Sequence, residues 1–283
     1  MDALYHGTGL AGAPSPRKAA PMDAEAEYNN RARVGESGAI IAGWAESAAR
    51  FRAAHPPETL RYGPGPREAM DLFLPTGTPR GAALLIHGGY WQALGREWGS
   101  HWAAGLLAQG VAVALPSYDL CPSVPLARIC AQMEAASATL HARLGMKLLA
   151  IGHSAGGHLA AWLLARAPHV TAALPISGLF WLEPLLPTSL NAALRLDAET
   201  ARELSPGLRP APGKPLHLVV GGAESAEFLR QSRDFAQGWG GSFEAPEGLN
   251  HFTVLDPLSD PSQPMTRRAA MLAGQACGLV MDA

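Results

Sequence analysis

The sequence predicts an α/β fold with a mostly parallel central sheet and helices on both of its faces. Continuous apolar runs, typical of strands buried on both sides, occur at 82–86, 111–115, 147–151, 172–176 and 216–220. Segments with helical patterns alternate with these runs at 99–109, 124–143, 155–167 and 225–239, and another lies at 264–278. Strands that alternate with helices imply a parallel sheet covered on both sides.

Two further elements precede the first buried run. The alternation in 70–74, which ends before Pro75, predicts a strand, and 44–54 has a helical pattern. Pro175 is unusual within the run 172–176, because proline cannot donate to a strand ladder. We therefore expect Pro175 to mark the end of that strand or a bulge.

The 283 residues suit one large domain, which we assign to 26–283. Residues 1–25 are rich in Gly, Pro and Ala, lack periodicity, and are expected to form a flexible arm. The segment 181–206 interrupts the alternation and predicts short helices. It is either a small helical cap over a site or a surface excursion without a role.

Composition excludes several classes of protein. The formal net charge is −2 and no Lys/Arg run occurs, so we expect neither a nucleic-acid nor a membrane partner. Cys121, Cys130 and Cys277 show no CxxC spacing, which argues against a disulfide framework or a metal site. The first residues lack the apolar core of a signal peptide, and no stretch is apolar over the roughly 18–20 residues of a membrane span. A cytoplasmic location is the expectation.

The strongest motif is G-x-S-x-G at 152–156, which places Ser154 between an apolar strand and a helical segment. This strand–turn–helix setting is the one that a nucleophile elbow requires. Glycines at 152 and 156 allow strand and helix to approach closely. Ser154 is therefore the predicted nucleophile.

A second glycine-rich segment, His87-Gly88-Gly89-Tyr90-Trp91, follows an earlier strand. We expect an oxyanion hole made of backbone N–H groups of Gly88 or Gly89 and of Ala155, the residue after the nucleophile. Tyr90 and Trp91 are candidates for the wall of a substrate pocket, with core packing as the alternative.

The base and the acid follow from chain order, which in this arrangement is nucleophile, acid, histidine. His251 lies in a turn-like stretch beyond the last core strand and is the predicted base. Glu224 comes just after the run 216–220 and is the favoured acid. Glu227 and Asp256 are the alternatives, although Glu227 is expected to begin a helix and Asp256 comes after the histidine.

Several segments together resemble the kynurenine formamidase (arylformamidase) group of α/β-hydrolases. They are HGGYW at 87–91, YDLCP at 118–122, GHSAGGHL at 152–159, EYNNR at 27–31, and ESAEF with RQS at 224–232. The resemblance runs from about residue 27 to 255 and implies the α/β-hydrolase fold with a triad of Ser154, Glu224 and His251. Many relatives carry aspartate at the acid position, and either carboxylate can serve.

The resemblance implies a serine hydrolase that cleaves N-formyl-L-kynurenine or a similar aryl formamide, a reaction of tryptophan catabolism. It implies neither a metal nor an organic cofactor, and a small-molecule amide or ester substrate is the expected partner, with a homodimer left open. Trp91, Trp181 or Phe180 would stack on the aryl ring, and Asn191, Arg195 or Arg202 would bind the amino-acid head of the substrate. A general carboxylesterase and a non-catalytic binding protein of the same fold are the alternatives.

Overall fold

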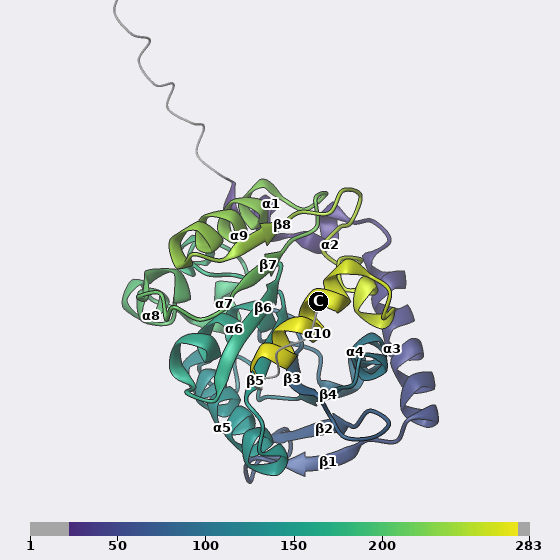
Figure 1. Cartoon of the computed structure of the whole chain (residues 1–283). Coiled ribbons are helices and arrows are strands. Elements are labelled where there is room, and N and C mark those ends of the chain that lie inside the picture. The colour runs from purple at the N-terminus through teal and green to yellow at the C-terminus, as the bar shows by residue number, and fades with distance from the viewer. Residues whose placement is uncertain (1–22, 277–283) are drawn as a thin grey trace, which may run out of the picture.

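A computed structural model describes residues 23–276 of the chain. Its centre is an eight-stranded sheet in the order β1-β2-β4-β3-β5-β6-β7-β8 (Figure 1). The strands are β1 (Glu58–Arg61), β2 (Ala69–Phe73), β3 (Gly81–Ile86), β4 (Val111–Pro116), β5 (Leu148–His153), β6 (Val170–Ile176), β7 (His217–Val219) and β8 (Ser242–Glu244). β2 pairs antiparallel with β1 and with β4, and every other pair is parallel. The predicted α/β-hydrolase fold is confirmed.

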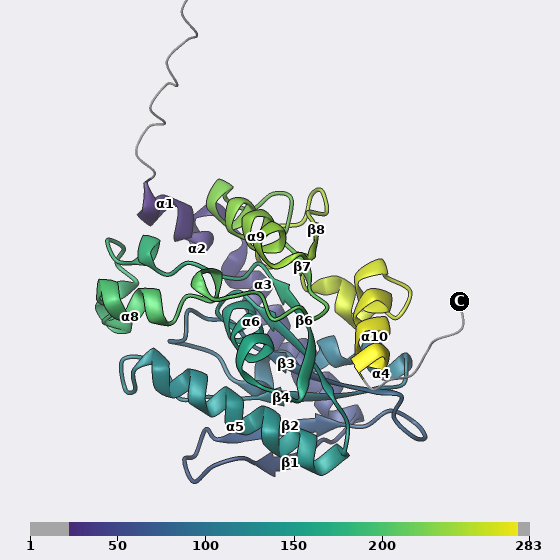
Figure 2. The same ribbon diagram turned by 60° about the vertical axis from the view of Figure 1, so that its left-hand side comes forward.

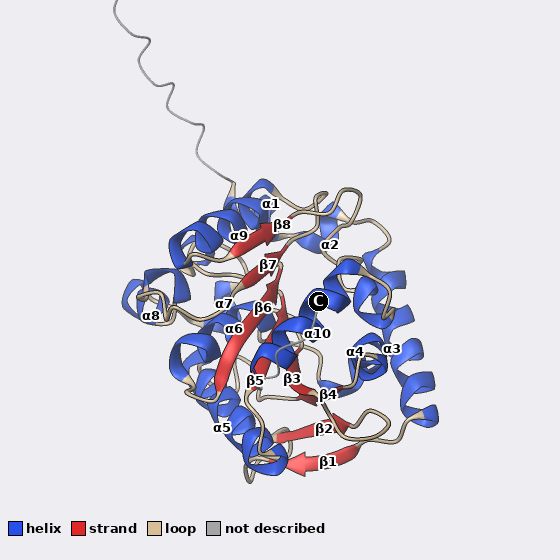
Figure 3. Ribbon diagram, viewed as in Figure 1, coloured by secondary structure: helices blue, strands red, loops and turns tan. Residues whose placement is uncertain are grey.

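Helices cover both faces of the sheet (Figures 2 and 3). One face carries α5 (Leu126–Leu144), α6 (Ala155–Arg166) and α9 (Ala226–Trp239), and the other carries α3 (Ser37–Ala54), α4 (Ala103–Ala108) and α10 (Pro264–Ala276). β3 shows how the sequence produces these two layers. Leu84 and Ile86 enter the core beneath α5 and α6, whereas Ala83 and Leu85 enter the core beneath α4 and α10. Successive side chains point to opposite faces, so a continuous apolar run fills both cores.

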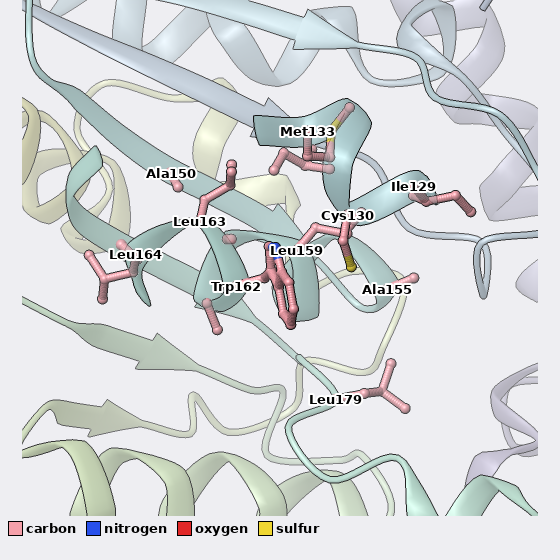
Figure 4. Close-up of a cluster of buried hydrophobic side chains, with 14 of the residues drawn as sticks. Ile129, Cys130, Met133, Ala150, Ala155, Leu159, Trp162, Leu163, Leu164 and Leu179 are labelled. Atoms are coloured by element: carbon pink, nitrogen blue, oxygen red, sulfur yellow. The ribbon is translucent and has the colours of Figure 1, made fainter. Parts of the chain in front are cut away.

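The packing of α5 and α6 on the sheet is shown in Figure 4. Leu159 and Leu163 of α6 lie in the same buried cluster as Ala150 of β5, and Met133 comes from α5. All four side chains are fully buried. Truncation of such a leucine to alanine costs about 2–5 kcal/mol of unfolding free energy. This core fixes the position of α6, and with it the turn that precedes α6.

Helix ends follow local sequence signals. Ser225 caps α9 by accepting a hydrogen bond from the Phe228 N–H, at 3.3 Å. Gly145 and Gly240 end α5 and α9 in the left-handed conformation, with φ of 67° and 69°. Glycine adopts this conformation without the penalty that a Cβ would bring.

The structure differs from the predicted elements at several places. β1 and β8 were not predicted: they are only four and three residues long and partly exposed, so they lack the continuous apolar pattern. The helix predicted at 99–109 is two 3₁₀ turns, Arg96–Trp98 and Ser100–Trp102, followed by α4. α3 begins at Ser37 rather than at 44.

Pro175 neither ends β6 nor forms a bulge. It pairs with Gly152 of β5, and β6 continues to Ile176. On the β7 side, the N–H groups of Ala173 and Ser177 donate to Pro215 and Val219. Pro175 falls between these two donors, so the sheet loses one ladder bond there and the strand continues.

Two further segments lie outside the central sheet. Residues 1–22 of the predicted arm lie outside the described residues, but Ala24 and Glu25 already belong to α1 (Ala24–Tyr28), which is followed by α2 (Asn30–Arg33). The segment 181–206 contains a 3₁₀ turn (Glu183–Leu185), α7 (Asn191–Leu194) and α8 (Ala198–Glu203), as predicted. Within residues 23–276, no helix has both the length and the apolar character that crossing a bilayer requires.

Candidate active site

Ser154 lies in the sharp turn between β5 and α6, with φ of 56° and ψ of −119°. A positive φ is costly for a residue with a side chain and occurs mainly where the surroundings enforce it. At Ser154 the close packing of the neighbouring backbone provides this constraint. A Cβ on Gly152 would lie 1.9 Å from the Gly156 carbonyl oxygen, and one on Gly156 would lie 2.1 Å from the Ile86 carbonyl oxygen. The two glycines therefore let β3, β5 and α6 meet closely enough to present Ser154.

Glu224 and His251 form a buried pair at the same edge of the sheet. Glu224 follows β7, and its Oε2 lies 2.6 Å from Nδ1 of His251. The other oxygen, Oε1, accepts hydrogen bonds from Ser177 Oγ at 2.5 Å and from the Gly221 N–H at 2.7 Å. Since a carboxylate only accepts, the His251 proton lies on Nδ1 and leaves Nε2 as a base.

The other two acids are occupied elsewhere. Glu227 lies in the first turn of α9, where it accepts from Tyr28 Oη at 2.9 Å and pairs with Arg230 at 2.7 Å. Asp256 is exposed at the start of the 3₁₀ turn Asp256–Ser259. Glu224 is therefore the carboxylate that contacts His251.

His153 holds the loop that carries His251. Its Nε2–H donates to the His251 carbonyl oxygen at 2.8 Å. Burial lowers the pKa of His153 well below its ordinary value, so this ring stays neutral. The ring also packs edge-on against Trp44, which contacts Phe252. Neither Ser177 nor His153 was predicted to support the triad, since no motif marks a residue that acts through another.

The predicted oxyanion residues lie close to Ser154. A Cβ on Gly88 would lie 3.1 Å from Ser154 Cβ, and Gly89 has φ of 96° and faces the same cavity as Ser154. Ala155 is the first residue of α6, where the helix dipole favours negative charge. Among the described residues, none accepts a hydrogen bond from the N–H of Gly88, Gly89 or Ala155. These groups are free to bind a developing oxyanion.

His87 stabilises this loop. Its Nδ1–H donates to the Gly88 carbonyl oxygen at 2.8 Å, and its ring stacks on Tyr118 with centroids 4.1 Å apart. The Tyr118 hydroxyl reaches the carbonyl oxygens of both His87 and Gly88, at 3.0 and 3.2 Å. Burial lowers the pKa of His87 to about 3, so it is neutral at ordinary pH.

Ser154 and His251 face one cavity of about 250 Å³. No hydrogen bond between these two side chains is recorded among the described residues, and in free enzymes such contacts are often long and tighten when substrate binds. The cavity is walled by the oxyanion loop, by α3, by the N-terminal helices and by the 181–206 segment. Its lining residues are Glu25, Tyr28, Asn29, Asn30, Arg31, Ile41, Trp44, Gly89, Tyr90, Ala93, Leu94, His153, Ser154, Thr188, Ser189, Leu190, His251 and Phe252.

Of the predicted pocket aromatics, only Tyr90 lines this cavity. Trp91 does not line this cavity: it is fully buried, with its ring edge-on to His158 at 5.1 Å. Trp181 also lies outside the cavity, where it packs against Phe235 and beneath Arg230. Phe180 is buried in a stack with Phe235.

The residues predicted to bind a substrate head group lie elsewhere too. The Asn191 side chain bonds the backbone of Leu186 and Leu196 within its own segment. Arg195 is exposed, and Arg202 lines a separate depression beside Trp162. In the part of the chain that the structure describes, no cluster of three His, Cys, Asp or Glu side chains is arranged to hold a metal ion.

Comparison with known proteins shows which proteins the chain resembles. Kynurenine formamidase from Salmo salar is 29% identical over 242 residues, which cover 76% of this chain and 81% of that protein. Kynurenine formamidase from Danio rerio is 27% identical over 237 residues, with the same two shares. A crystal structure from Silicibacter sp. TM1040, described as that of a candidate thioesterase, is 35% identical with a TM-score of 0.83, and covers 89% of this chain and 99% of that one.

The chain is an α/β-hydrolase that resembles the kynurenine formamidases. It is a hydrolytic enzyme. An esterase from Pyrobaculum calidifontis shares the fold at a TM-score of 0.66 and 17% identity, covering 85% of this hydrolase and 93% of that chain. No protein-family model matches the hydrolase.

Proposed function

We propose that this hydrolase is an arylformamidase that cleaves N-formyl-L-kynurenine or a similar aryl formamide through a Ser154–His251–Glu224 triad. The observation that carries the proposal is the Glu224–His251 pair, bonded at 2.6 Å, facing the same cavity as the strained Ser154. The kynurenine formamidases among its relatives support the substrate class.

The hydrogen bonds around His251 support a role for each group. Because Nδ1–H of His251 is committed to Glu224, Nε2 is the atom that takes the Ser154 proton as Oγ attacks the formyl carbon. The negative oxygen of the tetrahedral intermediate binds the free N–H groups of Gly89 and Ala155. His251 then returns the proton to the leaving arylamine, which would be a poor leaving group as an anion.

Water completes the cycle by the reverse route. It attacks the formyl-enzyme as His251 removes its proton, formate leaves, and Ser154 recovers its hydroxyl. The imidazolium formed in each half-reaction lies against the Glu224 carboxylate. Ser177 and Gly221 hold that carboxylate from behind, so it needs no rearrangement when the charge develops.

The size of the cavity favours a small acyl group. Its volume of about 250 Å³ lies below the range of roughly 300–1,000 Å³ usual for ligand pockets. An aromatic ring with an amino-acid side chain occupies most of such a space, and formyl is the smallest acyl group. The cavity volume therefore favours formyl over a long acyl chain beside an aryl leaving group.

A carboxylesterase for short acyl or aryl esters is the second candidate, since its chemistry is the same up to the leaving group. The Silicibacter relative is described as a candidate thioesterase, which supports ester-type substrates as an alternative. A non-catalytic binding protein is the third. Labelling by a fluorophosphonate probe that Ser154→Ala abolishes would dispose of it.

The decisive experiment compares steady-state hydrolysis of N-formyl-L-kynurenine and p-nitrophenyl acetate, with Ser154→Ala as control. An arylformamidase should reach a kcat/KM of about 10⁴ M⁻¹s⁻¹ or more on the formamide, clearly above the ester. Turnover of the ester alone would indicate a generic esterase. Activity that survives in Ser154→Ala would refute the assignment of the triad.

A further inference from the structure

Part of the cavity wall comes from the N-terminal helices α1 and α2. Glu25 of α1 accepts hydrogen bonds from the Ser189 N–H and hydroxyl, both at 2.7 Å, which tie α1 to the 181–206 segment. These bonds hold the pKa of Glu25 below its ordinary value, so it remains a carboxylate. The Tyr90 hydroxyl donates to the Tyr28 carbonyl oxygen at 2.7 Å and ties the same helices to the oxyanion loop.

Asn30, a buried residue that lines the cavity, has an unpaired side-chain acceptor. Because the Tyr90 hydroxyl proton is committed to Tyr28, the Tyr90 oxygen can only accept from Asn30, at 3.3 Å. Asn30 must therefore present its NH₂ group to Tyr90 and turn its Oδ1 away. Asn30 is 4% exposed and lines the cavity, and its Oδ1 has no hydrogen-bond partner among the described residues. Such a buried acceptor costs free energy unless a ligand donor meets it.

The charges on the wall are of both signs. Among the described residues that line the cavity, Arg31 is the one Lys or Arg side chain and Glu25 is the one carboxylate. Arg31 forms no ion pair with any carboxylate of residues 23–276, whereas Arg33 in the same helix pairs with Glu27 at 3.4 Å. A cation, an anion and a free acceptor on one wall match a ligand that is itself a zwitterion.

We propose that Glu25, Asn30 and Arg31 form a subsite that selects substrates with a free amino-acid head group. Arg31 binds the α-carboxylate, and Glu25 and Asn30 Oδ1 accept from the α-ammonium. This inference deepens the proposed function, on which it rests, because it explains how an aryl formamide that carries an amino acid is distinguished from a simple anilide. It also replaces the residues of the 181–206 segment that the sequence suggested for this role.

Binding of two product-like amines tests the subsite without relying on turnover. L-kynurenine carries the amino-acid head group, and 2′-aminoacetophenone keeps the aryl ketone and amine but lacks it. Calorimetric titration of the intact enzyme should show L-kynurenine binding about 10-fold or more tightly than 2′-aminoacetophenone. Arg31→Gln and Glu25→Gln should each remove most of that preference by weakening L-kynurenine alone, and Arg33→Gln, the matched control, should retain it.

Equal binding of the two amines by the wild-type enzyme would overturn the subsite, as would a preference that survives in Arg31→Gln. Hydrolysis of N-formyl-L-kynurenine, measured separately, distinguishes this failure from failure of the proposed function. Formamide turnover without the binding preference would refute the subsite and support the arylformamidase activity. The binding preference without formamide turnover would support the subsite and refute the arylformamidase activity.

Discussion

Replacement of Glu224 by glutamine tests the triad through the orientation of a single amide. Oε1 of Glu224 receives two donors, Ser177 Oγ and the Gly221 N–H. In Glu224→Gln the amide oxygen must take that position, because the NH₂ group cannot accept. The NH₂ group then faces His251 and donates to Nδ1. His251 is forced into the tautomer with its proton on Nε2, where it cannot accept the proton of Ser154.

The expected loss follows from this change of tautomer. An acid-to-amide substitution in a comparable triad lowers kcat by about 10⁴, which corresponds to a barrier higher by about 5 kcal/mol. The residual rate would come from the oxyanion donors and from substrate binding. KM should change little, since Glu224 does not line the cavity.

The assay is steady-state hydrolysis of N-formyl-L-kynurenine or of the better ester substrate, with thermal unfolding to show that the variant is folded. Glu224→Asp serves as the control, because it keeps the charge, and it should retain far more activity than Glu224→Gln. A folded Glu224→Gln enzyme within 10-fold of wild type would refute the assignment of Glu224 as the acid and the argument from hydrogen-bond donors.

Two further predictions concern stability. Gly152→Ala would place its Cβ 1.9 Å from the Gly156 carbonyl oxygen. We therefore expect a loss of activity and a loss of several kcal/mol of unfolding free energy, the latter measured by urea denaturation. A variant with wild-type stability would contradict the close approach. Burial lowers the pKa of His87 to about 3 and that of His158 to about 4, so both bind protons more readily when unfolded, and stability falls as pH drops below the unfolded value of about 6.5. Each histidine should lower the unfolding free energy by about 2 kcal/mol between pH 7 and pH 5. Urea unfolding at the two pH values should show a smaller loss of unfolding free energy in a folded His158→Gln variant than in wild type. An equal loss would argue against a neutral buried His158.

The buried strands and the pairing of Glu224 with His251 could be predicted from the sequence. The apolar runs predict β3 to β7. The G-x-S-x-G motif predicts a tight turn between a strand and a helix. His251 and Glu224 follow from their order along the chain. β1 and β8 escaped prediction since short, partly exposed strands gain their stability from neighbours rather than from their own pattern.

The cavity wall could not be read in the same way. Whether an aromatic residue enters a cavity depends on the direction of its side chain, which is set by backbone angles: Tyr90 and Trp91 are adjacent, with φ of 48° and 56°, yet only Tyr90 reaches the cavity. Arg31 and Glu25 lie far from the triad in sequence and belong to helices of four and five residues with no strong periodicity. Only tertiary contacts, such as Glu25 with Ser189, bring them to the site.

The separation of this wall from the triad has a consequence for the divergence of such enzymes. The bond-breaking groups sit on turns at the ends of sheet strands, where most substitutions would disturb the core. The groups that face the distal part of a ligand sit on two short helices near the start of the described chain, held by a few side-chain hydrogen bonds. Substitutions or exchanges in that stretch can change the range of accepted compounds while the hydrolytic apparatus stays intact. New specificities can therefore evolve from a common hydrolytic core through a small and tolerant part of the chain.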